Sequence, residues 1–265
     1  MNKFGLIFKH YFMRILKYPM NLFSMLLLPT VIILLFAFVN DYNTEANLIF
    51  HGHNVMHTAM VFQNIFFFQL FGMFGNLESL HEFSTGEHKW RLSAAPVKRT
   101  TFVAAILLGS WIVNILQGLV VFVVTNIALN VYWGNLLVSV LAFLGISLFA
   151  QAVGVLLFVA TKNVGQATAI AYPLSFFIGA LSGFIIPIRA LINHRFIDFL
   201  AEWSPLTLAS QAVFEGGRFG TIDLMDGTYT GGDMGLAIQS LLVVFATAAV
   251  IAVISYTLGK VKKVW

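Results

Sequence analysis

Long, uninterrupted runs of apolar residues dominate the chain. A helix needs about 20 mostly apolar residues to cross a bilayer, and the runs that reach this length are 19–40, 56–77, 102–129, 135–160, 165–187 and 234–259. They are continuous and do not alternate, which predicts helices and not the strands of a β-barrel. We therefore expect an all-α integral membrane protein with six transmembrane helices in a single domain over residues 1–265.

The basic residues gather on one side of this predicted topology. Six spans place both termini on the same side, and that side holds 12 of the 15 Lys and Arg residues, including every Lys. The other side has only Arg189, Arg195 and Arg218, and it carries eight of the eleven acidic residues. Because Lys and Arg accumulate in cytoplasmic loops, both termini are predicted to be cytoplasmic.

The composition narrows the chemistry. Charged residues make up 10% of the chain, whereas soluble domains have about a quarter. No Cys is present, which excludes a disulfide scaffold and thiolate metal ligands. The chain also lacks Walker-type GxxxxGK[ST], GxSxG and HExxH motifs. We therefore expect neither an enzyme nor a cofactor in this chain, and a membrane enzyme is the least favoured class.

The predicted spans contain no Asp, Glu, Lys or Arg. Ion-coupled carriers usually keep such groups inside the membrane, so a secondary carrier or passive channel is only an alternative to an energy-driven transporter. Span two carries two helical stripes, one with Gln63, Phe67, Leu70 and Phe74 and the other with aromatic and amide residues that suit an amphipathic substrate. Packing against a neighbouring helix is the alternative. The predicted translocation path consists of Phe62, Phe66, Gln69, Asn114 and Gln117.

Two polar regions have simple interpretations. Residues 2–17 place apolar side chains at helical spacing among basic ones, which predicts an amphipathic helix in the cytoplasmic interface; a solvated basic tail is the alternative. His51, His53 and His57 cluster in a predicted external loop. We interpret them as interfacial histidines and predict no metal site, with zinc or copper binding as the alternative.

The most polar cytoplasmic stretch, HEFSTGEHKWRLSAAPVKR at 81–99, has the features of a short helix. Ser84 and Glu87 show the spacing of a capping box, which predicts a helix start at Ser84. Pro96 disfavours helix in the residue before it, so the helix should end near Ala94. Trp90 is a large apolar residue on this polar element, which indicates docking or interface anchoring. A plain connecting loop is the alternative.

Two stretches of the chain resemble the type-2 ABC exporter permeases (ABC-2 type exporter transmembrane subunits). The first is this cytoplasmic stretch, where the matching residues are Glu82, Thr85, Gly86, Glu87, Leu92, Pro96, Val97 and Arg99. The second follows span five, where they are Ser182, Gly183, Pro187, Pro205, Leu206 and Thr207. The family writes Gly-Thr where this chain has Thr85-Gly86. With the amphipathic amino terminus and six spans, the resemblance covers essentially the whole length.

The resemblance implies a permease domain in the bacterial cytoplasmic (inner) membrane. It implies two such permeases, as identical copies or paralogues, and two ATP-binding cassette subunits that carry ATP and Mg. Such an exporter would move a hydrophobic or amphipathic substrate, for example a drug, a bacteriocin-like peptide or a lipid-linked molecule. Contact with the ATPase would come from Glu82, Ser84, Thr85, Gly86, Glu87, Trp90, Arg91 and Pro96. External re-entrant helices would form a gate with Ser182, Gly183, Pro187 and Pro205, for which a surface helix is the alternative.

Overall fold

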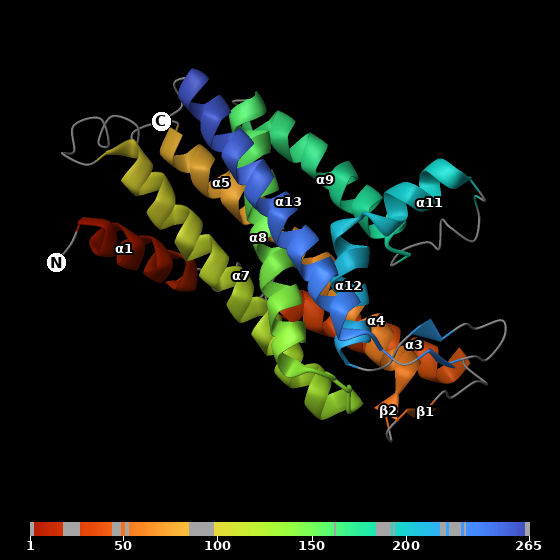
Figure 1. Cartoon of the computed structure of the whole chain (residues 1–265). Helices are drawn as coiled ribbons and strands as arrows, with labels where there is room; N and C mark the ends of the chain where they lie inside the picture. Colours follow the sequence, from red (N-terminus) through yellow and green to blue (C-terminus); the bar gives the residue numbers. More distant parts are fainter. Residues whose placement is uncertain are drawn as a thin grey trace.

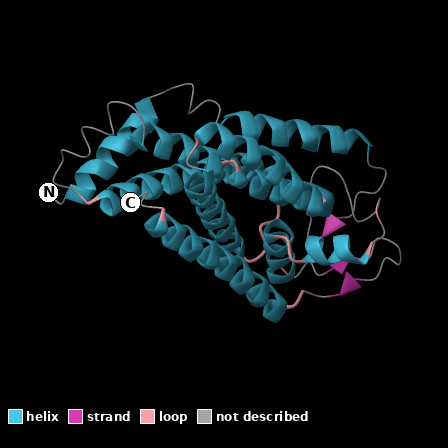
Figure 2. Cartoon of the chain, turned by 90° about the horizontal axis from the view of Figure 1, so that it is seen from above, coloured by secondary structure: helices cyan, strands magenta, loops and turns pink. Residues whose placement is uncertain are grey.

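Apolar helices form nearly all of the structure, a computed structural model. It describes residues 3–17, 27–43, 49–50, 53–84, 98–161, 163–183, 192, 194–217, 221–222, 229–230 and 232–262. The helices are α1 (Lys3–Lys17), α3 (Leu28–Asn43), α4 (Val55–Leu70), α5 (Gly72–Ser84), α7 (Arg99–Leu129), α8 (Leu136–Thr161), α9 (Val164–Leu181), α11 (Arg195–Glu202), α12 (Pro205–Gly216) and α13 (Met234–Val261). Figures 1 and 2 show them as one bundle.

Two short antiparallel strand pairs lie outside the helices. β1 (Ile49–Phe50) pairs with β2 (His53–Asn54), with Ile49 opposite Asn54. β3 (Thr221–Ile222) pairs with β4 (Tyr229–Thr230), with Thr221 opposite Thr230. Both pairs lie in segments that the predicted topology places outside the membrane.

Five helical stretches are long and apolar enough to cross a membrane. They are Thr58–His81, Thr100–Leu129, Leu136–Thr161, Val164–Leu181 and Met234–Val261, and the first combines most of α4 and α5. The helix at the first predicted span, α3, is apolar only over Leu28–Val39 among the described residues. The six-span count therefore stays a prediction, while five spans are supported by length and composition.

Two of the predicted span ends are wrong. Span two was expected to end at residue 77, but α5 continues to Ser84. Helical hydrogen bonding does not require apolar side chains beyond the bilayer, so the apolar run was shorter than the helix. Span five was expected to reach residue 187, but α9 ends at Leu181. Gly183 follows with φ +80°, a conformation that ends helices and favours glycine.

The central helix of the bundle is α8, which packs against α4, α5, α7, α9, α12 and α13 (Figure 1). Small residues allow this close packing. A Cβ added at Gly154 would lie 2.9 Å from the backbone oxygen of Met73 in α5, so the two helix backbones approach closely, as small residues permit in membranes. At the end of α8, the Lys262 ammonium donates to the oxygens of Val159 (3.1 Å) and Ala160 (2.6 Å). The end of α13 therefore lies beside the end of α8.

The segment between α9 and α13 forms two dissimilar helices. α11 exposes Phe196, Phe199 and Trp203. α12 begins with Pro205 at its first turn and is mostly buried among α4, α8 and α13. Because α12 packs inside the bundle, it is not the surface helix that was the alternative for this segment. Its depth in a membrane stays a prediction.

Candidate functional site

The long second span is interrupted in its middle. α4 ends at Leu70 and α5 begins at Gly72, with Phe71 between them. Around the break, the Phe71 N–H donates to Phe68 O (3.1 Å) and the Phe74 N–H to Phe71 O (3.0 Å). These bonds join residues three apart and tighten the chain locally, as 3₁₀ turns do. Helix breaks are tolerated in a membrane where neighbouring side chains satisfy the freed backbone groups.

An amide from α7 supplies such a group at this break. Asn114 is fully buried, and its Nδ2 donates to Gln69 O (3.2 Å) and to Ser147 Oγ of α8 (3.1 Å). In return, Gln69 Nε2 donates to Asn114 O (3.2 Å). Gly72 makes the contact possible, because a Cβ there would lie 2.3 Å from Asn114 Nδ2. Three helices thus meet at one polar cluster, the break cluster (Gln69, Gly72, Asn114 and Ser147).

A second amide pair lies further along α5. Asn76 Nδ2 donates to Gln151 Oε1 of α8, and both residues are buried. Gln151 Nε2 has no hydrogen-bond partner among the described residues. The sequence analysis noted Gln151 only as one of several uncharged polar residues, and it did not single out Asn76. Residue type alone could not reveal which amides meet across helices.

The five residues predicted to line a translocation path all lie inside the single chain. Phe62 is packed against Trp133, with 4.6 Å between ring centroids, and against Phe214. Phe66 lines a cavity of about 370 Å³ among α4, α7 and α8. Gln69 and Asn114 belong to the break cluster, and Gln117 is also buried. These contacts give the five residues packing and hydrogen-bonding roles within one protomer, and their role in a path stays a prediction.

The second stripe of span two meets aromatic residues of α9. Phe74 stacks on Tyr172 with 4.3 Å between ring centroids, and Phe67 lies 5.9 Å from Phe176. Phe71, at the break, contacts both Phe67 and Phe74. Tyr172 and Phe176 are each 49% exposed. We call Phe67, Phe71, Phe74, Tyr172 and Phe176 the aromatic face. The sequence predicted its α4–α5 half but missed the α9 half, which only the four-residue spacing of Tyr172 and Phe176 could have indicated.

The amino-terminal helix is attached to both helices that flank the cytoplasmic stretch. Residues 3–17 form the predicted helix, α1, and Tyr11 is its one buried apolar anchor among the described side chains. The Tyr11 hydroxyl forms hydrogen bonds with Ser79 Oγ of α5 and with Ser110 Oγ of α7 (2.9 Å). Gly109 leaves room for the ring, since a Cβ there would lie 2.6 Å from Tyr11 Cδ1. Movement of α5 or α7 would therefore also move α1.

The predicted coupling residues lie mostly outside the described part of the chain. Thr85, Gly86, Glu87, Trp90, Arg91 and Pro96 fall there, and Glu82 and Ser84 are described only as backbone of α5. Ser84 is the last residue of α5 rather than the start of a new helix. The coupling role of these residues stays a prediction.

The predicted gate residues are only partly described. Ser182 donates to Gly179 O (2.8 Å), and Gly183 turns the chain away from α9. Pro205 begins α12, and Pro187 lies outside the described residues. The side chains of His51, His53 and His57 lie outside them too. Within the described part, no group of three His, Asp or Glu residues is placed to hold a metal ion.

One acidic side chain joins the last two helices at the predicted external end. Glu215 is buried at the end of α12, and its Oε2 accepts a hydrogen bond from the Asp233 N–H (2.8 Å). Asp233 caps α13 by accepting from the Gly235 N–H (2.7 Å). A carboxylate at a helix N-terminus is favoured by the helix dipole. Glu215 therefore links α12 to the start of α13.

Comparison with known proteins agrees with this architecture. The family model described as ABC-2 type transporter matches residues 2–216, which covers α1 to α12. No curated protein matches the chain. The matched range includes the interrupted span, the break cluster and the buried α12. Since the match covers most of the 265 residues, the chain belongs to the ABC-2 type transporter family, as a multi-pass membrane transport component.

Proposed function

We propose that the chain is the transmembrane subunit of an ATP-driven exporter that moves a hydrophobic or amphipathic molecule out of the cytoplasm. Two permease copies, identical or paralogous, would work with two ATP-binding cassette subunits that hold ATP and Mg. Family membership supports the transport role. The observation that carries the substrate class is the aromatic face, which is apolar, partly exposed and continuous across α4, α5 and α9.

The aromatic face is the proposed substrate contact. Aromatic rings bind amphipathic molecules by apolar contact and by the electrostatics of their faces. In one protomer, Tyr172 and Phe176 have much of their surface uncovered. In the proposed assembly, the same face of a second permease would lie opposite, with the substrate between the two.

A mechanical route connects this face with the cytoplasmic stretch. α5 ends at Ser84 and α7 begins at Arg99, so residues 85–98 join the two helices at one end of the bundle. In our proposal an ATPase subunit displaces this segment through Glu87 and Trp90. The displacement would reach Phe74 through α5, and the break at Phe71 would let α5 move separately from α4.

The test is reconstitution of the chain with its ATP-binding subunit in proteoliposomes. We expect export to require ATP, and substrate to stimulate ATP hydrolysis. Glu87→Ala should reduce the substrate-stimulated rate while the two subunits still co-purify. Asp226→Ala, in the predicted external segment, is the matched control and should behave as wild type. Transport by the chain alone without nucleotide would contradict the proposal and favour a passive channel or secondary carrier.

A second pair of variants tests the substrate face. Tyr172→Ala should slow export because it removes a ring that stacks on Phe74. Ile170→Ala is the matched control on the same helix, since Ile170 is 47% exposed but lies outside the aromatic face. Equal export rates in the two variants would remove the aromatic face from the proposal.

A further inference from the structure

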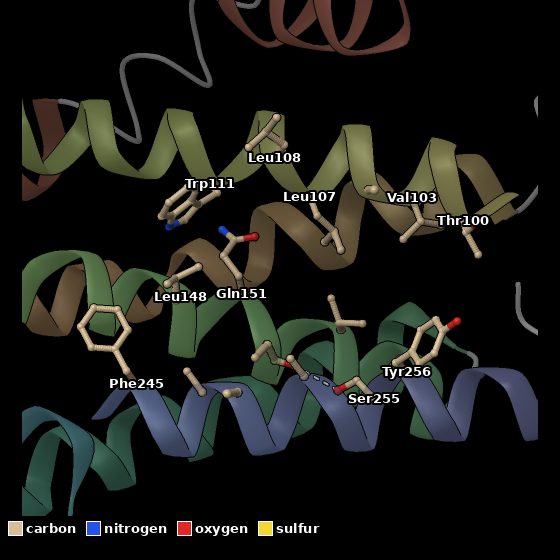
Figure 3. Close-up of a pocket in the computed structure, with 16 residues that line it drawn as sticks. Thr100, Val103, Leu107, Leu108, Trp111, Leu148, Gln151, Phe245, Ser255 and Tyr256 are labelled. Carbon is tan, nitrogen blue, oxygen red and sulfur yellow. Dashed lines mark hydrogen bonds between the residues drawn. The ribbon is translucent and has the colours of Figure 1, made fainter. Parts of the chain in front are cut away.

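A cavity of about 860 Å³ lies between α7 and α13, with α8 at its base (Figure 3). This volume is in the range of sites for drug-sized ligands. Small side chains open much of the space, namely Ala104, Ala152, Ala248, Ala249 and Ala252. Thr100 and Tyr256 line it and are exposed, so the cavity opens onto the surface of the bundle. It shares no residue with the aromatic face.

Two hydrogen-bond donors in this apolar cavity are unused. Gln151 of α8 is 7% exposed; its Oε1 is taken by Asn76, whereas its Nε2 has no partner among the described residues. Trp111 of α7 has a buried Nε1 that likewise lacks a partner there. Figure 3 shows both side chains at the same part of the cavity, from facing helices. A buried donor without an acceptor costs free energy, and a ligand that supplies the acceptor recovers it.

The remaining polar group at the cavity wall is already occupied. The Ser255 hydroxyl donates to Ile251 O (2.6 Å), with Ala152 O at 3.5 Å. No charged side chain is among the described residues that line the cavity. An ionic ligand would therefore find no counter-charge. The chemistry selects an uncharged, mostly apolar ligand with an acceptor at the level of Gln151 and Trp111.

We propose that this cavity binds a lipid-soluble molecule that carries a carbonyl group within an apolar body. The carbonyl oxygen has two lone pairs and accepts from both Gln151 Nε2 and Trp111 Nε1. The apolar body lies along the alanines of α8 and α13. The ligand enters from the bilayer, because the cavity opens at the apolar outer surface of α7 and α13, where Leu119 and Val253 are exposed.

The site also has a physical connection to the helix that leads to the cytoplasmic stretch. Gln151 is held on one side by Asn76 of α5 and presents its free amide nitrogen on the other. A bound ligand that orients the Gln151 amide therefore stabilises its bond to α5. This inference concerns one protomer and does not depend on an ATPase or on the exported substrate.

The experiment uses the full-length chain in lipid nanodiscs, without nucleotide or partner. The probe is a 15-carbon dialkyl ketone with a diazirine near one chain end, and the control probe is the hydrocarbon with a methylene in place of the carbonyl. We expect saturable labelling of residues 100–111 and 245–256 by the ketone, with an affinity about tenfold higher than that of the hydrocarbon, as two hydrogen bonds would give. Peptide mass spectrometry locates the label.

Three variants sharpen the test. Trp111→Phe keeps the ring but removes the donor, and it should weaken ketone binding about fivefold and leave hydrocarbon binding unchanged. Ala252→Phe fills the cavity from an exposed position and should abolish labelling by both probes. Trp133→Phe is the matched control, because Trp133 Nε1 is also buried without a partner among the described residues but lines the other cavity. It should leave labelling of α7 and α13 unchanged.

Equal affinity for ketone and hydrocarbon in the wild-type chain would overturn the proposal, since the cavity would then hold any lipid chain. Equal ketone affinity in wild type and Trp111→Phe would also overturn it. If Ala252→Phe does not fold, the Trp111→Phe comparison decides alone. All these measurements are made without ATP, so their failure is distinct from a failure of ATP-driven export.

Discussion

Replacement of Asn114 by alanine should destabilise the bundle at the break in the second span. The side chain of Asn114 is fully buried and donates to both Gln69 O and Ser147 Oγ. The variant leaves the carbonyl of Gln69 without this donor, next to the interruption at Phe71. It also leaves a void beside Gly72, against which the amide packs.

The size of the effect follows from these contacts. Side-chain hydrogen bonds inside membrane proteins contribute on average about 0.6 kcal/mol, with a maximum near 1.7 kcal/mol, so the two bonds amount to about 1–3 kcal/mol. The void adds about 1 kcal/mol, because a well-packed interior does not fully collapse around missing atoms. Asn114→Ala should therefore lower the free energy of unfolding by about 2–4 kcal/mol.

Equilibrium unfolding in mixed detergent–SDS micelles, followed by far-UV circular dichroism, measures this loss. Asn126→Ala is the matched control, because Asn126 is exposed on the same helix; its loss should stay within about 0.5 kcal/mol. A double-mutant cycle with Ser147→Ala isolates the Asn114–Ser147 bond, for which we expect a coupling of about 0.6–1.7 kcal/mol. Losses that are equal for Asn114→Ala and Asn126→Ala, or a coupling of zero, would refute the reasoning.

Three further variants test other contacts of the bundle by the same unfolding assay or by hydrogen exchange. Gly154→Ala should cost about 1–3 kcal/mol because the added methyl group meets the backbone of α5, whereas Gly75→Ala, which points into open space, should not destabilise; equal stability of the two would contradict the close approach of α5 and α8. Tyr11→Phe loses the hydroxyl that ties α1 to α5 and α7, at about 0.5–1.5 kcal/mol per hydrogen bond, so the amides of α1 should exchange faster than in wild type, and unchanged exchange would disprove this attachment. Glu215→Ala should cost about 1.5–3 kcal/mol because the Asp233 N–H loses a charged acceptor, while Glu215→Gln, which keeps an oxygen there, should lose less; equal losses would argue against the hydrogen bond as the cause.

The helices were largely predictable because a membrane imposes simple rules. The runs 102–129, 135–160 and 234–259 correspond to α7 (Arg99–Leu129), α8 (Leu136–Thr161) and α13 (Met234–Val261). A chain in hydrocarbon must satisfy its backbone internally, so an apolar run of sufficient length becomes a helix. The method failed where apolar length and helix length differ, at α5 beyond the bilayer and at α9 before Gly183.

The candidate site was predictable only in part. The sequence indicated an aromatic stripe on the second span, but its residues divide between two environments. Phe62 and Phe66 lie inside the bundle, whereas Phe67 and Phe74 meet α9. A helix in the middle of a bundle has neighbours on several sides, so periodicity identifies a stripe without identifying what it faces.

By itself, the sequence determined the class of this protein, most of its helix positions, its amphipathic first helix and its family resemblance. These follow from local properties, namely apolar length, helical spacing and short motifs. Only the tertiary structure decided which polar groups meet and which remain unused. Asn114 joins the broken span to α8, while Gln151 joins α5 on one side and leaves a donor in an apolar cavity on the other. Hydrogen bonds between helices depend on helix rotation and on close approach at glycines, and neither is encoded in the composition of any single span.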